Sequence, residues 1–163
     1  MSNSRKLNTV FTLMVMTISL LGTACHSLRP DVSTADSEAM KKVYGQYGVS
    51  VSRRAGPFLY IGGLVAFNDD GSVHAPGDGE KQIAVIYTRL EKILAMHGAT
   101  MKNVVRENSF VTNWEEFFKG APIRIGAYDK AGAEYPAATA VEVKSLAEKG
   151  IIAEIDFIAY LGH

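Results

Sequence analysis

The sequence of 163 residues contains a single cysteine, Cys25, and no excess of either charge sign. A lone cysteine excludes a disulfide within the chain and any metal or iron–sulfur site built from several cysteines. Arg5 and Lys6 are the only charged residues before Cys25, and subtracting them from the 17 basic residues leaves 15 against 17 acidic ones, a net charge of −2. Binding to nucleic acid through its phosphates depends on a basic surplus. The composition therefore argues against a nucleic-acid partner.

Long apolar runs are also scarce, and the one at the N-terminus has the layout of a secretory signal. Arg5 and Lys6 form a short positive region, an uncharged stretch follows at 7–24, and small residues stand at 22–24, where a signal peptidase reads the chain. Asn, Thr and Ser side chains dilute the stretch, whereas a membrane span needs about 20 predominantly apolar residues. We expect cleavage after Ala24 and export to the periplasm or cell envelope, which leaves 139 residues (163 − 24).

The residue after this cleavage point is Cys25, and its role has two interpretations. The segment Leu-Leu-Gly-Thr-Ala-Cys at 20–25 resembles the box of bacterial lipoproteins, in which the cysteine is acylated and becomes the new N-terminus. It departs from that pattern because Gly22 stands where an aliphatic residue is usual. Either Cys25 is acylated and holds the protein at a membrane, or cleavage leaves an unmodified thiol at the tip of the chain.

The rest of the chain divides into a polar tether at 25–48 and one domain at 49–163. Alternating or densely apolar segments predict strands. These are 49–52, 57–65, 104–111, 139–143 and 153–159. One long helix is predicted from Gly79 to His97, and a short one at 114–118, after Asp78 and Asn113 as N-caps. The mixed order indicates an α+β single domain, a mixed β-sheet with two helices on one face.

Motifs for common kinds of chemistry are missing. No glycine-rich phosphate loop stands between a strand and a helix, and no serine has the surroundings of a hydrolase nucleophile. None of the four histidines has a second ligand at metal-binding spacing. These histidines are His26, His74, His97 and His163. We expect neither a metal ion nor a cofactor.

Five segments, each weak alone, occur together in an order that carries a family resemblance. They are Phe58-Leu59-Tyr60-Ile61-Gly62-Gly63, Gln82, Phe110-Val111-Thr112-Asn113, 134–143 and 153–159. Together they resemble the RidA family, also called YjgF or L-PSP. The resemblance implies a chorismate-mutase-like fold and a homotrimer with ligand clefts between subunits. It also implies the hydrolysis of reactive 2-imino and enamine acids to 2-oxo acids, with release of ammonia.

The site residues that the resemblance implies are only partly present. Active relatives carry an arginine in the motif that reads Pro-Ala-Ala-Thr here, so that Ala138 occupies the arginine position. A guanidinium binds a substrate carboxylate through two parallel charge-assisted hydrogen bonds, which alanine cannot replace. Gly62 stands in place of the cleft serine, and Ala140 in place of the cleft cysteine. The resemblance thus predicts weakened chemistry.

Glu154 is the catalytic residue that the resemblance retains, since it matches the glutamate that positions water. A carboxylate there could act as a general base. Thr139, Tyr135 and Arg124 are the other candidate cleft residues, and Arg124 could replace the missing charge. Without the resemblance, Glu154 would be an exposed residue of a strand. Gln82 faces away from the apolar stripe of its helix, and we expect it to bond a loop backbone.

Two classes of function remain open. The first is a homotrimeric binding module that holds a small imine-, enamine- or 2-oxo-acid-like metabolite, with deaminase activity weakened or lost because of Ala138. The second is an active enamine or imine deaminase that uses Glu154 and another cation. Ribonuclease activity, an older label of the family, is disfavoured by the near-neutral charge.

The role of Cys25 is testable by cell fractionation. If Cys25 is acylated with two or more chains, anchoring is stable, so the wild type should sediment with membranes and Cys25→Ser should be soluble. Ser27→Ala, two residues further on, is the matched control and should not change the distribution. A soluble wild type, or a membrane-bound Cys25→Ser protein, would contradict acylation.

Overall fold

The structure is a computed structural model that describes residues 44–162; the predicted signal, Cys25 and most of the tether lie outside this range. Its centre is a five-stranded mixed sheet in the order β1-β2-β5-β3-β4. The strands are β1 (Ser52–Ala55), β2 (Phe58–Leu64), β3 (Val104–Val111), β4 (Ala137–Glu142) and β5 (Ala153–Tyr160). Only β3 and β4 run parallel to each other.

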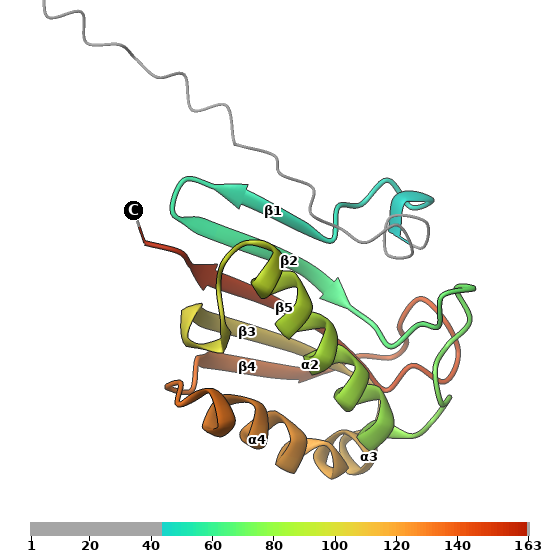
Figure 1. Ribbon diagram of the computed structural model, residues 1–163. Coiled ribbons are helices and arrows are strands. Elements are labelled where there is room, and N and C mark those ends of the chain that lie inside the picture. The colour runs from blue at the N-terminus through green and yellow to red at the C-terminus, as the bar shows by residue number, and fades with distance from the viewer. Residues whose placement is uncertain (1–43, 163) are drawn as a thin grey trace, which may run out of the picture.

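The helices are α2 (Gly79–Met96), α3 (Trp114–Lys119) and α4 (Ala121–Ala131), with a 3₁₀ turn, η1, at Met101–Asn103. In Figure 1, α2 and the α3–α4 pair lie on one side of the sheet. The predicted α+β class, with a mixed sheet and helices on one face, is confirmed. No helix within residues 44–162 combines the length and the apolar composition that a membrane crossing requires.

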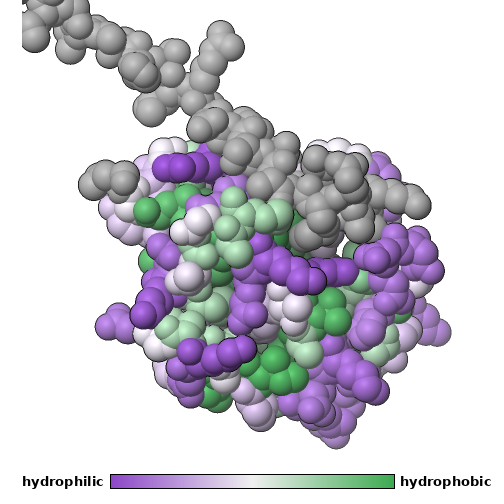
Figure 2. All heavy atoms as spheres, viewed as in Figure 1, coloured by the Kyte–Doolittle hydropathy of each residue, from purple (hydrophilic) through white to green (hydrophobic). Residues whose placement is uncertain are grey.

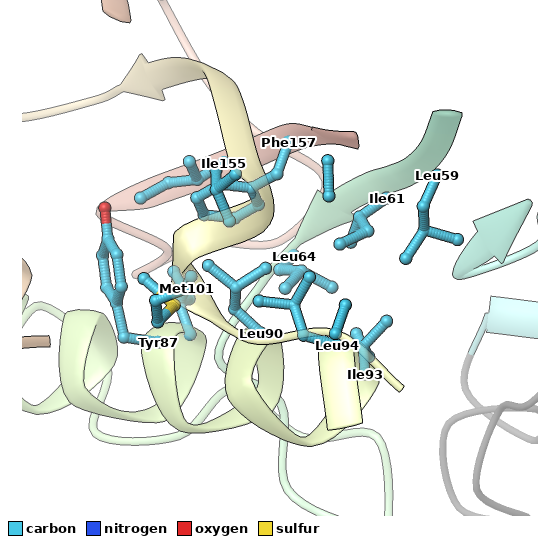
Figure 3. Packing of buried hydrophobic residues seen from close by; sticks show 14 of the residues in the cluster. Leu59, Ile61, Leu64, Tyr87, Leu90, Ile93, Leu94, Met101, Ile155 and Phe157 are labelled. Carbon is cyan, nitrogen blue, oxygen red and sulfur yellow. The ribbon is translucent and has the colours of Figure 1, made fainter. Parts of the chain in front are cut away.

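The core lies between α2 and the two central antiparallel strands. The helix turns one apolar stripe, with Tyr87, Leu90 and Leu94 among its members, toward the sheet. Leu59 and Leu64 of β2, together with residues of β5, meet this stripe from the sheet side, as Figure 3 shows. Since burying one such side chain stabilises the fold by about 1.5–3 kcal/mol, this contact fixes the position of α2.

Two glycines allow α3 and the start of α4 to approach α2 closely. A Cβ atom on Gly79 would lie 1.9 Å from the backbone oxygen of Glu116, and one on Gly120 would lie 2.5 Å from the Ile83 side chain. Neither distance is compatible with a larger residue unless the helices move apart. The close approach brings α4 over the half of the sheet formed by β3 and β4.

The predicted boundaries hold best where a residue pattern is strong. The caps Asp78 and Asn113 both accept a backbone hydrogen bond as expected. The first strand was predicted at 49–52 and lies instead at Ser52–Ala55, because the Gly56-Pro57 turn, with Gly56 at φ 58°, pairs Ala55 with Phe58. The pattern did not predict α4, which contains Pro122 and Gly126 and buries only Tyr128.

The side of the sheet away from the helices is open in the described chain. There Phe58, Tyr60 and Val105 are exposed, and all six residues of the edge strand β4 are exposed as well. Polar side chains cross the same side, where Asn108 donates to Asp156 at 2.7 Å. Figure 2 views the molecule as Figure 1 does and shows polar and apolar residues mixed on the visible surface.

Candidate functional site

A pocket of about 280 Å³ lies between the helices and the β3–β4 half of the sheet. Its strand wall includes Ala138 and Ala140 of β4, and its helix wall includes Phe117, Phe118 and Arg124. Three of the predicted cleft residues, Arg124, Ala138 and Ala140, thus come together, and Thr139 lines the same wall although its hydroxyl is bonded on the other side of the sheet. Sites for small ligands are concave, largely apolar and equipped with a few polar groups. This pocket has that character.

The polar floor of the pocket is Glu107, a carboxylate on β3 that is only 2% exposed. Three donors reach it from two helices: Tyr87 of α2 at 2.9 Å, Tyr128 of α4 at 3.1 Å and Arg124 Nε at 2.9 Å. Both tyrosine hydroxyls bond Oε2, while Arg124 bonds Oε1. A buried charge is tolerated when it is paired and its lone pairs are satisfied, and Glu107 meets both conditions.

The protonation states within this cluster follow from burial and from the charge of Glu107. Burial and then the negative charge of Glu107 raise the pKa values of Tyr87 and Tyr128 well above the ordinary tyrosine range. For Arg124, burial opposes the charged form, but its hydrogen bond to Glu107 and the charge there outweigh burial and raise the pKa. Near neutral pH Tyr87 and Tyr128 are therefore neutral hydroxyl donors, and Arg124 carries its full positive charge.

The Arg124 guanidinium is fixed at one edge. Its Nε is engaged by Glu107, and its Cζ lies 5.4 Å from the centroid of the Tyr128 ring, over the ring face. The side chain is 24% exposed. Within residues 44–162, no hydrogen bond of its two terminal nitrogens is found, and Arg124 is one of the residues that line the pocket.

The β4 wall of the pocket is made of small, uncharged side chains. Ala138 stands opposite Glu107 and Ala140 opposite Ser109 in the parallel register, so both alanines share the helix side of the sheet. Thr139 points to the other side, where its hydroxyl accepts a hydrogen bond from Arg106 at 2.7 Å. Strand β4 therefore supplies no charge to the pocket.

Glu154 lies on the opposite side of the sheet from Ala138. It alternates along β5 with Ala153 and Ile155, which are fully buried under the helices. Burial and then the charge of Asp156 raise the pKa of the Glu154 carboxyl. Its side chain occupies the space above Gly63, where a Cβ atom would lie 1.9 Å from Oε1. Within one chain, the structure does not bring Glu154 to the pocket.

Two other predicted residues also lie away from the pocket. The backbone N–H of Gly62 donates to Val51 at 2.8 Å, which ties β2 to the chain before β1. Tyr135 is 55% exposed and donates to Asp129 at 2.6 Å. Gln82 acts as expected on loop backbone, since its amide donates to Ala75 and Gly150.

Comparison with known proteins agrees with this architecture. A family model described as Endoribonuclease L-PSP matches residues 37–161. The chain belongs to this family. The resemblance found in the sequence motifs is thereby confirmed at the level of family, and the related structures confirm it at the level of fold.

Relatives of this L-PSP family chain are distant but match over most of their length. A RutC family protein of Pyrococcus horikoshii is 27% identical over 124 residues, which cover 76% of this chain and 94% of that protein. The crystal structure of the Rid family protein YyfA from Yersinia pestis is 28% identical, with a TM-score of 0.62 over 69% of this chain and 86% of that one. The structure of E. coli TdcF with bound serine shares the fold at 20% identity, with a TM-score of 0.62 over 69% and 87% of the two chains.

The cluster around Glu107 is the part of this L-PSP family site that the sequence motifs missed. Glu107 lies in the strand predicted at 104–111 and Tyr87 in the helix predicted from Gly79 to His97, and neither residue belongs to a motif. One signal was present: Glu107 alternates in phase with Ser109 and Val111, which face the core. A carboxylate in a core position is rarely buried without a partner, so this phase indicated a polar cluster.

The energetic weight of this cluster is testable with Tyr87→Phe. The substitution removes one donor from a buried carboxylate, and hydrogen bonds to charged groups contribute about 1.5–3 kcal/mol. We expect the free energy of unfolding, measured by denaturant titration at fixed protein concentration, to fall by about that amount. Tyr135→Phe removes a hydroxyl–carboxylate bond at the surface and should change it little. Equal losses in the two variants would contradict the role assigned to Glu107.

Proposed function

We propose that the protein is an exported homotrimer that binds a small imine-, enamine- or 2-oxo-acid-like metabolite in clefts between subunits, with deaminase chemistry weakened or lost. The observation that carries the proposal is the pocket itself, which is lined by Ala138 where active relatives are expected to carry arginine. The layout of residues 1–24 supports export to the periplasm or cell envelope.

The dimensions of the pocket favour a small ligand. Its volume of about 280 Å³ lies just below the usual range for small-molecule sites, which begins at about 300 Å³. The serine bound in the related TdcF structure is a ligand of comparably small size. A metabolite with a few carbon atoms beyond its carboxyl group fits this space, whereas a nucleic-acid strand needs an extended basic groove.

The weakened chemistry follows from the β4 wall. An imino acid offers a carboxylate, and the family's arginine would bind it from the position of Ala138. Here that position offers a methyl group next to Glu107, so nothing on β4 attracts an anion. A substrate could still enter, but it would lack the contact that orients its imine carbon toward water.

Self-association is supported by two surfaces that remain open in one chain: the edge strand β4 and the side of the sheet away from the helices. Edge strands with unpaired backbone groups and exposed apolar residues are normally covered, yet all of β4 is exposed here. Ala138 and Glu154 also lie on opposite sides of the sheet. A cleft that contains both residues therefore requires Glu154 from a second copy, and a closed ring of three copies provides it at each interface.

The alternative function, an active deaminase, is favoured by one observation. Arg124 lines the pocket and carries the positive charge that β4 lacks. Arg124, together with Glu154 of a second copy as general base, would supply the two charged groups that the hydrolysis needs.

The oligomeric state is the first test. Light scattering of the mature protein at micromolar concentration should give three times the chain mass. Val141→Glu, at an exposed position of β4, should reduce this mass because a buried unpaired charge is costly. Met96→Glu on α2 is the matched control, since both native side chains are 43% exposed. A wild-type monomer would overturn the proposal.

The second test restores the missing guanidinium. Loss of one partner of a desolvated charge pair costs about 2–5 kcal/mol, which corresponds to roughly 30- to 4,000-fold. We expect weak or no ammonia release from 2-aminoacrylate-type imines by the wild type, and a gain within that range for Ala138→Arg. Ala137→Arg, one residue earlier and facing the other side of the sheet, is the control and should give no gain.

Adding Glu154→Gln to Ala138→Arg should abolish the gain. Family-typical turnover by the unmodified protein would contradict the proposal and favour the alternative with Arg124. No gain from Ala138→Arg would mean that the cleft differs from the family's at more than one residue.

A further inference from the structure

We propose that the pocket binds an arylalkanoic acid, with the carboxylate on the terminal nitrogens of Arg124 and the ring between the β4 alanines and Phe117–Phe118. This inference rests on the proposed function because it assigns a ligand class to the same pocket. It differs from the motif-based expectation in that the charged contact comes from α4 rather than from β4.

The first step is the orientation of Arg124. Glu107 holds Nε, and the Arg124 Cζ lies over the Tyr128 ring. An arginine bonded in this way keeps its end-on pair of N–H groups, which match the two oxygens of a carboxylate. Since little side-chain freedom remains to be lost on binding, such a contact is preorganised.

The second step is the charge balance. Glu107 needs no further donors from Arg124, because its second oxygen accepts hydrogen bonds from Tyr87 and Tyr128. Glu107 therefore acts as a positioning residue that is satisfied by Nε and two neutral hydroxyls. Arg124 lines the pocket and its side chain is mostly shielded from solvent, and there an ionic contact is stronger than in bulk water.

The third step is the shape and polarity of the remaining wall. Phe117, Phe118 and Ile125 form an apolar side, and Phe118 and Ile125 are 61% and 44% exposed at its rim. Across from them stand Ala138 and Ala140, whose small side chains leave room for a flat group. Aromatic rings pack favourably against one another, so the ligand is expected to carry a ring and not only a short polar chain.

The chain contains its own probe for this pocket. Trp114 is the single tryptophan, and its ring stacks on Phe118 with centroids 5.5 Å apart. Titration of the mature trimer with phenylacetate should therefore change the tryptophan fluorescence, and calorimetry gives the affinity independently. Phenylacetamide has the same shape without the charge and should bind at least about tenfold more weakly. Acetate, which lacks the ring, should also bind more weakly than phenylacetate.

Variants separate Arg124 from general effects on the fold. Arg124→Lys keeps a charge but not the paired donors, and should weaken phenylacetate binding about tenfold or more. Arg124→Gln combined with Glu107→Gln leaves no buried unpaired charge, and this folded control should bind phenylacetate and phenylacetamide equally. Lys130→Gln, an exposed cation in the last turn of α4, should leave both affinities unchanged.

The outcomes distinguish this inference from the proposed function. Equal affinity of the wild type for phenylacetate and phenylacetamide would overturn the role of Arg124, as would a preference for the acid that persists in the double variant. Binding of 2-oxobutyrate without binding of phenylacetate would overturn the ligand class alone. If neither phenylacetate nor 2-oxobutyrate binds, the inference is wrong, and the 2-oxo-acid part of the proposed function is wrong as well.

Discussion

The arrangement of this molecule depends on one buried negative charge. Glu107 lies on β3, between β5 and β4. Its buried carboxylate needs hydrogen-bond donors, and in residues 44–162 these come from helices and not from the side chains of neighbouring strands. Tyr87 belongs to α2, and Tyr128 and Arg124 belong to α4, so that a single carboxylate connects both helices to β3. The close helix contacts at Gly79 and Gly120 bring these donors within reach. The pocket is the space left beside this cluster.

Under the proposed function, the position of the charge in the pocket is what separates this chain from the pattern that the family resemblance implies for active relatives. In that pattern the cation stands on β4, and here β4 presents alanine while the cation stands on α4. A guanidinium on the helix binds an anion from the other wall of the pocket, so the bound molecule would be turned relative to the water-activating carboxylate. The proposed function and the proposed acid site are compatible for this reason: the pocket would retain affinity for an acid while losing the alignment that hydrolysis needs.

Much of the fold could be predicted because its elements have strong periodic patterns. The apolar stripe of α2 and the alternation of β3 and β5 recur with clear period, and they are found close to the predicted residues. In contrast, the sequence of α4 shows no clear apolar stripe, and the helix buries only Tyr128. Pro122 and Gly126 also weaken the pattern by which a helix is predicted. Predicting the site was harder still. The bonds of Glu107 join residues 17 to 21 positions apart, and only the three-dimensional packing of α2 and α4 brings them together.

The close contact between Gly63 and Glu154 links two positions that are far apart in the chain. The Glu154 carboxylate and its Cγ and Cδ atoms occupy the volume that any side chain at position 63 would need. A larger residue at 63 is therefore compatible only with a shorter or displaced side chain at 154. Across related sequences the two sites should vary together, with glycine at the first wherever a glutamate at the second keeps the side-chain position seen here. A relative that lacks this glycine has, by the same geometry, moved or given up the carboxylate on that side of its sheet.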